Sequence, residues 1–239
     1  MSGVARPMNT PDSDWESTKQ AGILCALRVS VVQFSGRLAG ISAKDARFTM
    51  PTDEIVIVSG LPRSGTSMLM KMLEAGGVPP LTDHIRTPDE DNPKGYYEFE
   101  RVKQLESDKE WLPEARGKAV KIISFLLPHL PPGFRYRVLF LRREVTEVLA
   151  SQRQMLIRRG EEPDKTPDDR MAMLYGKHLS QVETWLANQA DTETVYLHHH
   201  EVIANPAVAA ETINGFLGGA MDVSAMASVV DPSLHRQRV

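Results

Sequence analysis

Ile55-Val-Ile-Val-Ser-Gly-Leu-Pro-Arg-Ser-Gly-Thr-Ser-Met-Leu-Met70 joins an apolar run, a glycine-bearing loop and an amphipathic segment. The residues from Ile55 to Val58 are all β-branched, which is typical of a parallel strand covered on both faces. Gly60 and Gly65 have the spacing of a loop whose backbone N–H groups can point at an anion. A helix that begins where the loop ends would add its positive N-terminal dipole. The stretch therefore predicts a strand, a phosphate-binding loop and a helix.

The position of the cation in this loop indicates the class of ligand. In a nucleoside triphosphatase, the second glycine is followed by a Lys that contacts the β- and γ-phosphates. Here Thr66 and Ser67 follow Gly65, and the cation is Arg63, inside the loop. A fork-shaped guanidinium beside the loop suits a second, planar anionic group. We therefore interpret Arg63, Ser64, Gly65, Thr66 and Ser67 as an anion-binding loop; the alternative is an ordinary strand–turn–helix corner.

Composition limits the class of protein. The chain has 239 residues, 41% of them hydrophobic, which is enough for the core of one α/β domain. Its net charge of −3 gives no general electrostatic case for a nucleic-acid partner. A single cysteine, Cys25, excludes an intramolecular disulfide and fits a reducing compartment, so we expect a cytoplasmic protein. The most apolar early segment, residues 21–41, is interrupted by Arg28 and Arg37, which argues against a membrane span.

Residues 1–50 have the character of an extension, and residues 51–239 that of the domain itself. The first dozen or so residues are polar and contain proline, which predicts disorder. Residues 17–43 have the apolar spacing of an amphipathic helix, which could pack on the domain or on a second copy of the chain as a homodimer. Alternatively, Met50 is the true start of the chain.

Strands and helices alternate through the rest of the chain. Further strands are predicted at residues 118–123, 137–141 and 194–197, and helices at residues 145–159, 168–188 and 205–217. Residues 78–113 are rich in proline and acids, and so long an irregular segment is usually functional. This order predicts an α/β fold in which a P-loop-type parallel sheet is flanked by helices on both faces, with ligand at the carboxyl ends of the strands.

A second anion site is predicted where the strand of residues 137–141 ends. In a P-loop nucleotide hydrolase, such a strand commonly ends in an Asp that holds Mg²⁺. Here Arg142 and Arg143 stand there, and two cations would repel a metal and attract another phosphate. Ser151 follows Arg143 by eight residues and can add a hydroxyl to the same anion. The alternative for Arg143 is a surface salt bridge to Glu144 or Glu147.

Three adjacent histidines, His198-His199-His200, invite a metal interpretation. Neighbouring side chains on a strand point to opposite faces, so three in a row rarely bind one ion. We therefore expect no metal.

These motifs resemble those of sulfotransferases that use 3′-phosphoadenosine-5′-phosphosulfate (PAPS). Gly60-Leu-Pro-Arg-Ser-Gly-Thr-Ser67 resembles the loop that holds the 5′-phosphosulfate in that family. The family's motif for the 3′-phosphate is similar to Val138-Leu-Phe-Leu-Arg-Arg-Glu-Val-Thr-Glu-Val-Leu-Ala-Ser151. In this match, Arg143 and Ser151 stand at the family's Arg and Ser. The resemblance covers residues 54–238, and its loop is similar to that of tyrosylprotein and many bacterial sulfotransferases. It implies the sulfotransferase fold, PAPS as co-substrate and no metal.

Two motifs of the cytosolic sulfotransferases are absent. Their Lys-Thr-His, which supplies the catalytic base, is replaced by Lys121-Ile-Ile123. Their Arg-Lys-Gly near the C-terminus is missing as well, although the arginines of residues 230–238 could serve the 3′-phosphate. These departures leave the base and the acceptor open.

Sulfuryl transfer requires cations for the charge that builds on the sulfonate and on the leaving phosphate. Arg63 is the first candidate for this role. Lys121 is the second, and its alternative is a solvated lysine at the end of a strand.

The acceptor must also lose a proton to a base. By the match to the tyrosylprotein enzymes, His84 stands where their catalytic Glu stands, and Arg86 where an Arg meets the substrate. The pKa of a histidine lies near neutrality, which suits a base. Glu98 is the rival, and Asp83 is a third candidate that could instead orient His84.

The sequence therefore predicts transfer of the sulfuryl group from PAPS to a hydroxyl or amine, with release of PAP (3′-phosphoadenosine-5′-phosphate). The acceptor is unidentified, and a carbohydrate, lipid, peptide or small alcohol would each fit. One alternative is a small-molecule kinase or another P-loop nucleotide-binding enzyme, which Thr66 and Arg143 oppose. A second is a catalytically inactive nucleotide-binding domain.

Overall fold

The computed structural model describes residues 53–83, 97–161 and 166–234. The predicted extension of residues 1–50, including Met50, lies outside these ranges. His84, Arg86 and the arginines of the C-terminal tail lie outside them too.

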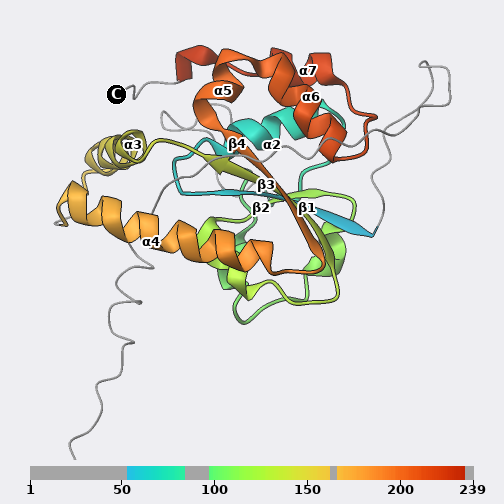
Figure 1. Ribbon diagram of the computed structural model, residues 1–239, viewed down its shortest axis with the longest axis horizontal. Coiled ribbons are helices and arrows are strands. Elements are labelled where there is room, and N and C mark those ends of the chain that lie inside the picture. The colour runs from blue at the N-terminus through green and yellow to red at the C-terminus, as the bar shows by residue number, and fades with distance from the viewer. Residues whose placement is uncertain (1–52, 84–96, 162–165, 235–239) are drawn as a thin grey trace, which may run out of the picture.

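Within the described ranges, four parallel strands form one sheet in the order β2-β1-β3-β4 (Figure 1). The strands are β1 (Glu54–Gly60), β2 (Ala119–Lys121), β3 (Arg135–Arg142) and β4 (Thr192–His198). At their carboxyl ends, Gly60 of β1 pairs with Leu141 of β3, and Arg142 pairs with His198 of β4. The predicted anion-binding loop and the predicted second anion site therefore leave the same edge of the sheet.

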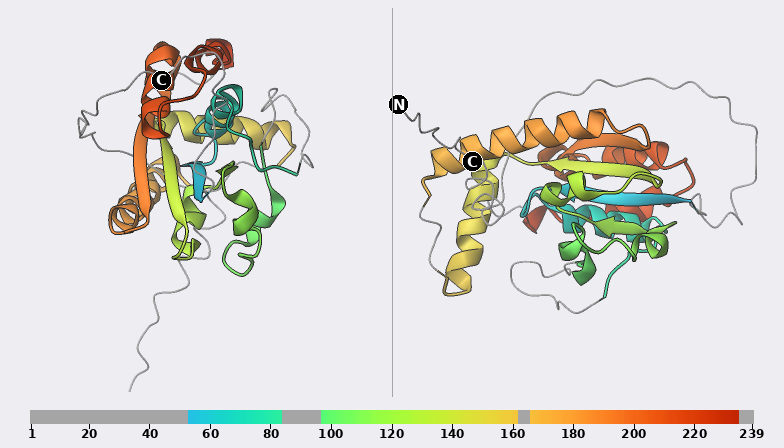
Figure 2. Two further views of the ribbon diagram at one scale, coloured as in Figure 1. Left: turned by 90° about the vertical axis from the view of Figure 1, so that its right-hand side faces the viewer. Right: turned by 90° about the horizontal axis from the view of Figure 1, so that it is seen from below.

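Helices cover both faces of this sheet. The α-helices are α2 (Thr66–Ala75), α3 (Val145–Arg158), α4 (Asp168–Ala187), α5 (His199–Ala204), α6 (Pro206–Phe216) and α7 (Val223–Ser228). The 3₁₀ helices are η1 (Glu100–Gln104), η2 (Leu112–Ala115), η3 (Ser124–His129) and η4 (Pro232–Leu234). Figures 1 and 2 show α2, α6 and α7 on one side of the sheet, and α4 with the segment that holds η1 to η3 on the other.

The side chains of β1 alternate between two cores. Ile55 and Ile57 pack with the apolar face of α4, whereas Val56 and Val58 pack with α2 and α6. All seven residues of β1 are buried, as expected of a central parallel strand. The predicted α/β fold, with a parallel sheet between two layers of helices, is confirmed.

The main difference from the sequence prediction follows β4. The three histidines were expected on a strand, but only His198 belongs to β4, while His199 and His200 open the short helix α5. The helix α5 has only six residues, with no Gly or Pro, between the strand and the start of the next helix at Asn205-Pro206. So short a segment shows little periodicity from which a helix could be predicted. No helix in the described part of the chain has both the length and the apolar character needed to cross a membrane.

A buried histidine joins α4 to the segment after β2. The Nε2 of His178 lies 3.0 Å from the Oγ of Ser124, and its ring stacks on Phe125 with the centroids 3.9 Å apart. Burial lowers the pKa of His178 to about 4. The ring is only 3% exposed, so it serves the packing of α4 and does not face an acceptor.

This histidine should make the stability of the fold depend on pH. Between the ordinary pKa of 6.5 and the folded pKa of about 4, the unfolded chain binds a proton that the folded chain does not. The contribution of His178 to the free energy of unfolding is therefore complete above pH 6.5 and is lost as the pH falls to about 4, a total of about 3 kcal/mol. Denaturant unfolding at several pH values gives the slope of this free energy against pH. His178→Gln should flatten that slope.

The matched control is His200→Gln, because that side chain is exposed and packs against no core. An unchanged slope in His178→Gln would contradict the assignment. An equal flattening in His200→Gln would do so as well.

Candidate active site

The loop between β1 and α2 is tightly wound. Arg63 has a left-handed backbone with φ 69°, and Gly65, the N-cap of α2, has φ 98°. The hydroxyl and the amide of Ser64 both donate to the carbonyl of Leu61, at 2.7 and 3.1 Å. Because Ser64 is fully buried, its side chain braces the loop from within and does not face a ligand.

Both glycines of the loop lie against other backbone or ring atoms. A Cβ on Gly60 would lie 2.5 Å from the carbonyl oxygen of Leu141 on β3. A Cβ on Gly65 would lie 2.7 Å from the Cδ2 of His199. From the sequence, His199 was weighed only as a possible metal ligand. Nothing in the sequence pattern indicated that its ring would pack against the loop.

The N-terminus of α2 faces the end of this loop. The amide of Met68 donates to the carbonyl of Gly65 at 2.9 Å, which sets the first helical turn. Thr66 and Ser67 lie in that turn and are partly exposed. The amides of a first turn have no acceptor within the helix, and the helix dipole is positive there. The loop and α2 together therefore favour an anion.

Three predicted residues from distant parts of the chain meet at the loop. The Nε of Arg63 donates to the Oγ of Ser151 on α3 at 3.1 Å. The Nη1 of Arg143, at the end of β3, donates to the backbone carbonyl of Arg63 at 3.1 Å. The structure thus joins the predicted 5′ loop directly to the predicted 3′-phosphate residues.

Arg143 also forms an ion pair with Glu147. Its Nε lies 2.8 Å from Oε2 of Glu147, and the two side chains are 8% and 10% exposed. The alternative to anion binding, stated from the sequence, was a surface salt bridge to Glu144 or Glu147. Glu147 is the partner, but the pair is buried and the guanidinium reaches the loop, so it is not a surface salt bridge.

Arg142 does not join this cluster, which corrects the expectation of two cations at the end of the strand. Adjacent side chains of β3 point to opposite faces, and Arg142 lies on the face covered by α4. Its Nη2 pairs with Glu183 at 2.7 Å, and its guanidinium carbon lies 4.2 Å from the centre of the Tyr196 ring.

Lys121 and Glu98 meet beside the loop. The Nζ of Lys121 lies 3.4 Å from Oε1 of Glu98, with the side chains 10% and 23% exposed. Lys121 pairs in register with Val58 of β1, two residues before Gly60. Both candidates therefore lie at the same end of the sheet as Arg63.

The backbone around Glu98 is held on both sides. Its carbonyl accepts hydrogen bonds from the hydroxyl of Thr82 at 2.9 Å and from the amide of Asp83 at 3.4 Å. The carboxylate of Asp83 accepts a hydrogen bond from the amide of Glu100 at 2.6 Å. Asp83 therefore braces the segment that carries Glu98.

The preceding residue, Tyr97, ties the same segment to α2. It has a left-handed backbone with φ 51°, and its hydroxyl donates a hydrogen bond to Glu74. Burial, followed by this hydrogen bond, raises the pKa of Tyr97.

The three histidines at the end of β4 do not point to a common centre. His199 is buried against the loop, whereas His200 is exposed. The rings of His198 and His200 are 5.7 Å apart at their centres. In the described ranges, no three His, Cys, Asp or Glu side chains form a group that could hold a metal ion.

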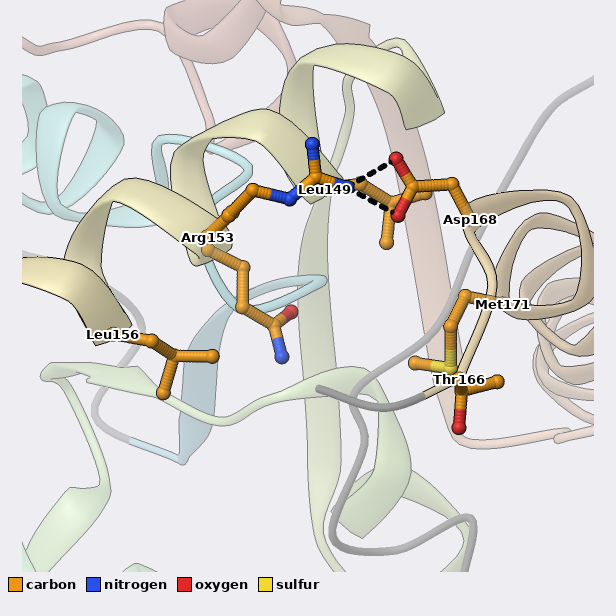
Figure 3. Close-up of a pocket in the computed structure, with 7 residues that line it drawn as sticks. Leu149, Arg153, Leu156, Thr166, Asp168 and Met171 are labelled. Atoms are coloured by element: carbon orange, nitrogen blue, oxygen red, sulfur yellow. Dashed lines mark hydrogen bonds and ion pairs between the residues drawn. The ribbon is translucent and has the colours of Figure 1, made fainter. Parts of the chain in front are cut away.

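A small hollow lies between α3 and α4, away from the loop (Figure 3). Leu149 and Leu156 of α3 and Met171 of α4 line it, and Arg153 pairs with Asp168 beside them at 2.5 Å. Residues 60–67, all of them described, do not line it. It is therefore separate from the cluster of Arg63, Arg143 and Ser151.

Comparison with known proteins shows which family model this chain matches. A family model described as a sulfotransferase domain matches residues 53–235. No curated protein matches the chain closely enough to count as a relative.

Solved structures with similar folds share little sequence with this chain. The sulfotransferase domain of the Synechococcus PCC 7002 olefin synthase is 15% identical over 82% of this chain and 90% of that one, with a TM-score of 0.49. Mouse sulfotransferase SULT7A1, complexed with PAP, is 16% identical over 77% and 64%, with a TM-score of 0.43. A sulfotransferase from Alicyclobacillus acidocaldarius is 16% identical over 72% and 85%, with a TM-score of 0.42.

Proposed function

The chain belongs to the sulfotransferase domain family, and we propose that it transfers the sulfuryl group of PAPS to a hydroxyl or amine acceptor and releases PAP. One observation carries the choice of donor. Arg143 donates to the backbone of Arg63, and Arg63 donates to Ser151, so the two predicted anion-binding elements form one connected cluster. A donor with negative groups at both its 5′ and 3′ ends fits such a cluster.

Each end of the donor has its own residues. The backbone of residues 64–67 and the start of α2 would hold the 5′-phosphosulfate, since helix N-termini favour anions. Arg143 and Ser151 would hold the 3′-phosphate. The guanidinium of Arg63 is bonded to Ser151 and would lie between the two groups.

The reaction balances with these residues alone. An acceptor oxygen or nitrogen attacks the sulfur, and the bond between the sulfur and the 5′-phosphate oxygen breaks. Negative charge passes to that phosphate, where Arg63 stabilises it, with Lys121 as a second cation. The acceptor proton leaves to a base on the protein.

Among the described residues, Glu98 is the side chain that we propose as this base. It is partly exposed, it lies 3.4 Å from Lys121, and its backbone is fixed by Thr82 and Asp83. Lys121 would hold the carboxylate close to the donor. His84 remains the base that the family resemblance favours, with Arg86 as an acceptor contact.

Glu98→Gln is expected to lower kcat by about 10²–10⁴, the usual weight of a general base, with little loss of PAP affinity. The measurement is steady-state transfer beside calorimetric titration with PAP. Glu100→Gln is the matched control, because Glu100 is close in sequence and its carboxylate pairs with the exposed Lys103.

His84→Ala in the same assay decides between the two candidates. If His84→Ala lowers kcat and Glu98→Gln leaves it unchanged, the base is His84. Glu98 then serves only as the partner of Lys121.

The kinase alternative differs in what it needs from the site. A nucleotide-dependent kinase needs a loop Lys and an acid for Mg²⁺, and Thr66 and Arg143 stand in those places. Titration of the full chain with PAP, and separately with ATP plus Mg²⁺, tests the two directly. Tight binding of PAP without metal and a weak response to ATP supports the proposal; the reverse result overturns it.

A further inference from the structure

Glu147 is a buried carboxylate inside a cluster that favours anions. It lies in the first turn of α3, its side chain is 10% exposed, and it accepts a hydrogen bond from Nε of Arg143 at 2.8 Å. The mechanism proposed above gives it no part. A negative charge close to a phosphate site repels the ligand, so its place there requires another benefit.

One face of α3 holds both arginines of the site. Glu147 and Ser151 are four residues apart and therefore lie one above the other on this face. Glu147 accepts from Arg143, and Ser151 accepts from Arg63. The helix thus fixes each guanidinium with one side-chain oxygen.

The contact with Glu147 also reaches the loop. Arg143 uses Nε for Glu147 and Nη1 for the carbonyl of Arg63. Because a guanidinium is planar, bonds to both of these nitrogens fix the direction of the whole group. The carbonyl that Arg143 holds belongs to a residue with a left-handed backbone, φ 69°, so the same contact supports the shape of the loop.

We propose that Glu147 is a positioning residue: it orients Arg143 toward the 3′-phosphate and so sets the preference for a donor that carries this group. The inference rests on the proposed function, because it takes PAPS as the donor. Glu147 itself would touch Arg143 and not the ligand.

A purely electrostatic role predicts a different result. If Glu147 acted only as a negative charge, its removal would strengthen the binding of any nearby anion. If it positions Arg143, its removal weakens the contact with the 3′-phosphate and leaves a ligand without that group largely unaffected. The comparison of PAP with AMP, which has the 5′-phosphate alone, therefore separates the two roles.

The experiment is calorimetric titration of the full chain with PAP and with AMP, for the wild type, Glu147→Gln and Glu147→Met. Methionine keeps the length and helix propensity of glutamate but offers Arg143 no carboxylate. The preference for PAP over AMP is expected to fall about tenfold in Glu147→Met, the effect of one lost hydrogen bond to a charged group. It should fall less in Glu147→Gln, because an amide oxygen still accepts, but more weakly.

Glu144→Gln is the matched control. It removes the same charge three residues earlier, at an exposed position, and should leave the preference within about twofold of the wild type. If Glu147→Met does not fold, Glu147→Gln decides, and its preference must then fall clearly below that of Glu144→Gln.

Two outcomes overturn one proposal or the other. A preference that stays unchanged in Glu147→Met, including the case in which PAP and AMP lose affinity equally, overturns the role of Glu147. A wild type that binds PAP no better than AMP overturns the donor assignment instead.

Discussion

Replacing Arg63 with alanine is expected to lower kcat for sulfuryl transfer by about 10³-fold or more, the range seen when an arginine that stabilises a transferred anionic group is removed. Negative charge builds on the sulfonate and on the leaving phosphate, and Arg63 is the cation inside the loop that we propose holds the phosphosulfate. Its guanidinium is therefore expected to supply much of the stabilisation. The measurement is steady-state transfer from PAPS with the full chain.

Two variants make this prediction specific. Arg63→Lys keeps the charge but loses the fork that reaches Ser151, so its activity should lie between the wild type and alanine. Arg170→Ala removes an equal charge from an exposed position on α4 and should leave kcat unchanged. If Arg63→Ala transferred sulfate at close to the wild-type rate while remaining folded, the loop would not be the catalytic element.

The fold could be predicted from the sequence because its signals are local. The β-branched run of residues 55–58, the two loop glycines and the Asn205-Pro206 helix start each specify a backbone conformation. The strand at residues 118–123 was predicted too long: β2 contains only residues 119–121. Ile122 is buried and apolar beyond the end of the strand, so hydrophobicity alone did not mark the boundary.

The site could be predicted only where a residue acts through its position in a motif. Arg63, Arg143 and Ser151 were named from spacing, and the structure brings them together. Two other contacts depend on the register of β3 and β4, and the sequence motifs do not specify that register. They are the ion pair of Arg142 with Glu183 and the packing of His199 on Gly65. Tertiary contacts of this kind have no local signal.

Gly60→Ala is expected to lower the free energy of unfolding by about 3 kcal/mol or more and to abolish measurable binding of PAP. Gly60 is the last residue of β1 and has φ 149°, a conformation that a side chain rarely adopts. An added Cβ would lie 2.5 Å from the carbonyl oxygen of Leu141 and 2.7 Å from the hydroxyl of Ser64. Denaturant unfolding gives the first quantity and calorimetric titration the second.

Gly133→Ala separates the two causes of this loss. Gly133 also has a positive φ, 90°, but a Cβ there would meet nothing within 4 Å, so its cost is that of the backbone alone, about 1 kcal/mol. The excess loss in Gly60→Ala then measures the contacts with Leu141 of β3 and with Ser64. That contact is made two residues before Arg143, so the loop must move away from the arginine that holds it. Normal PAP binding in a folded Gly60→Ala protein would mean that the loop and β3 are not coupled in this way.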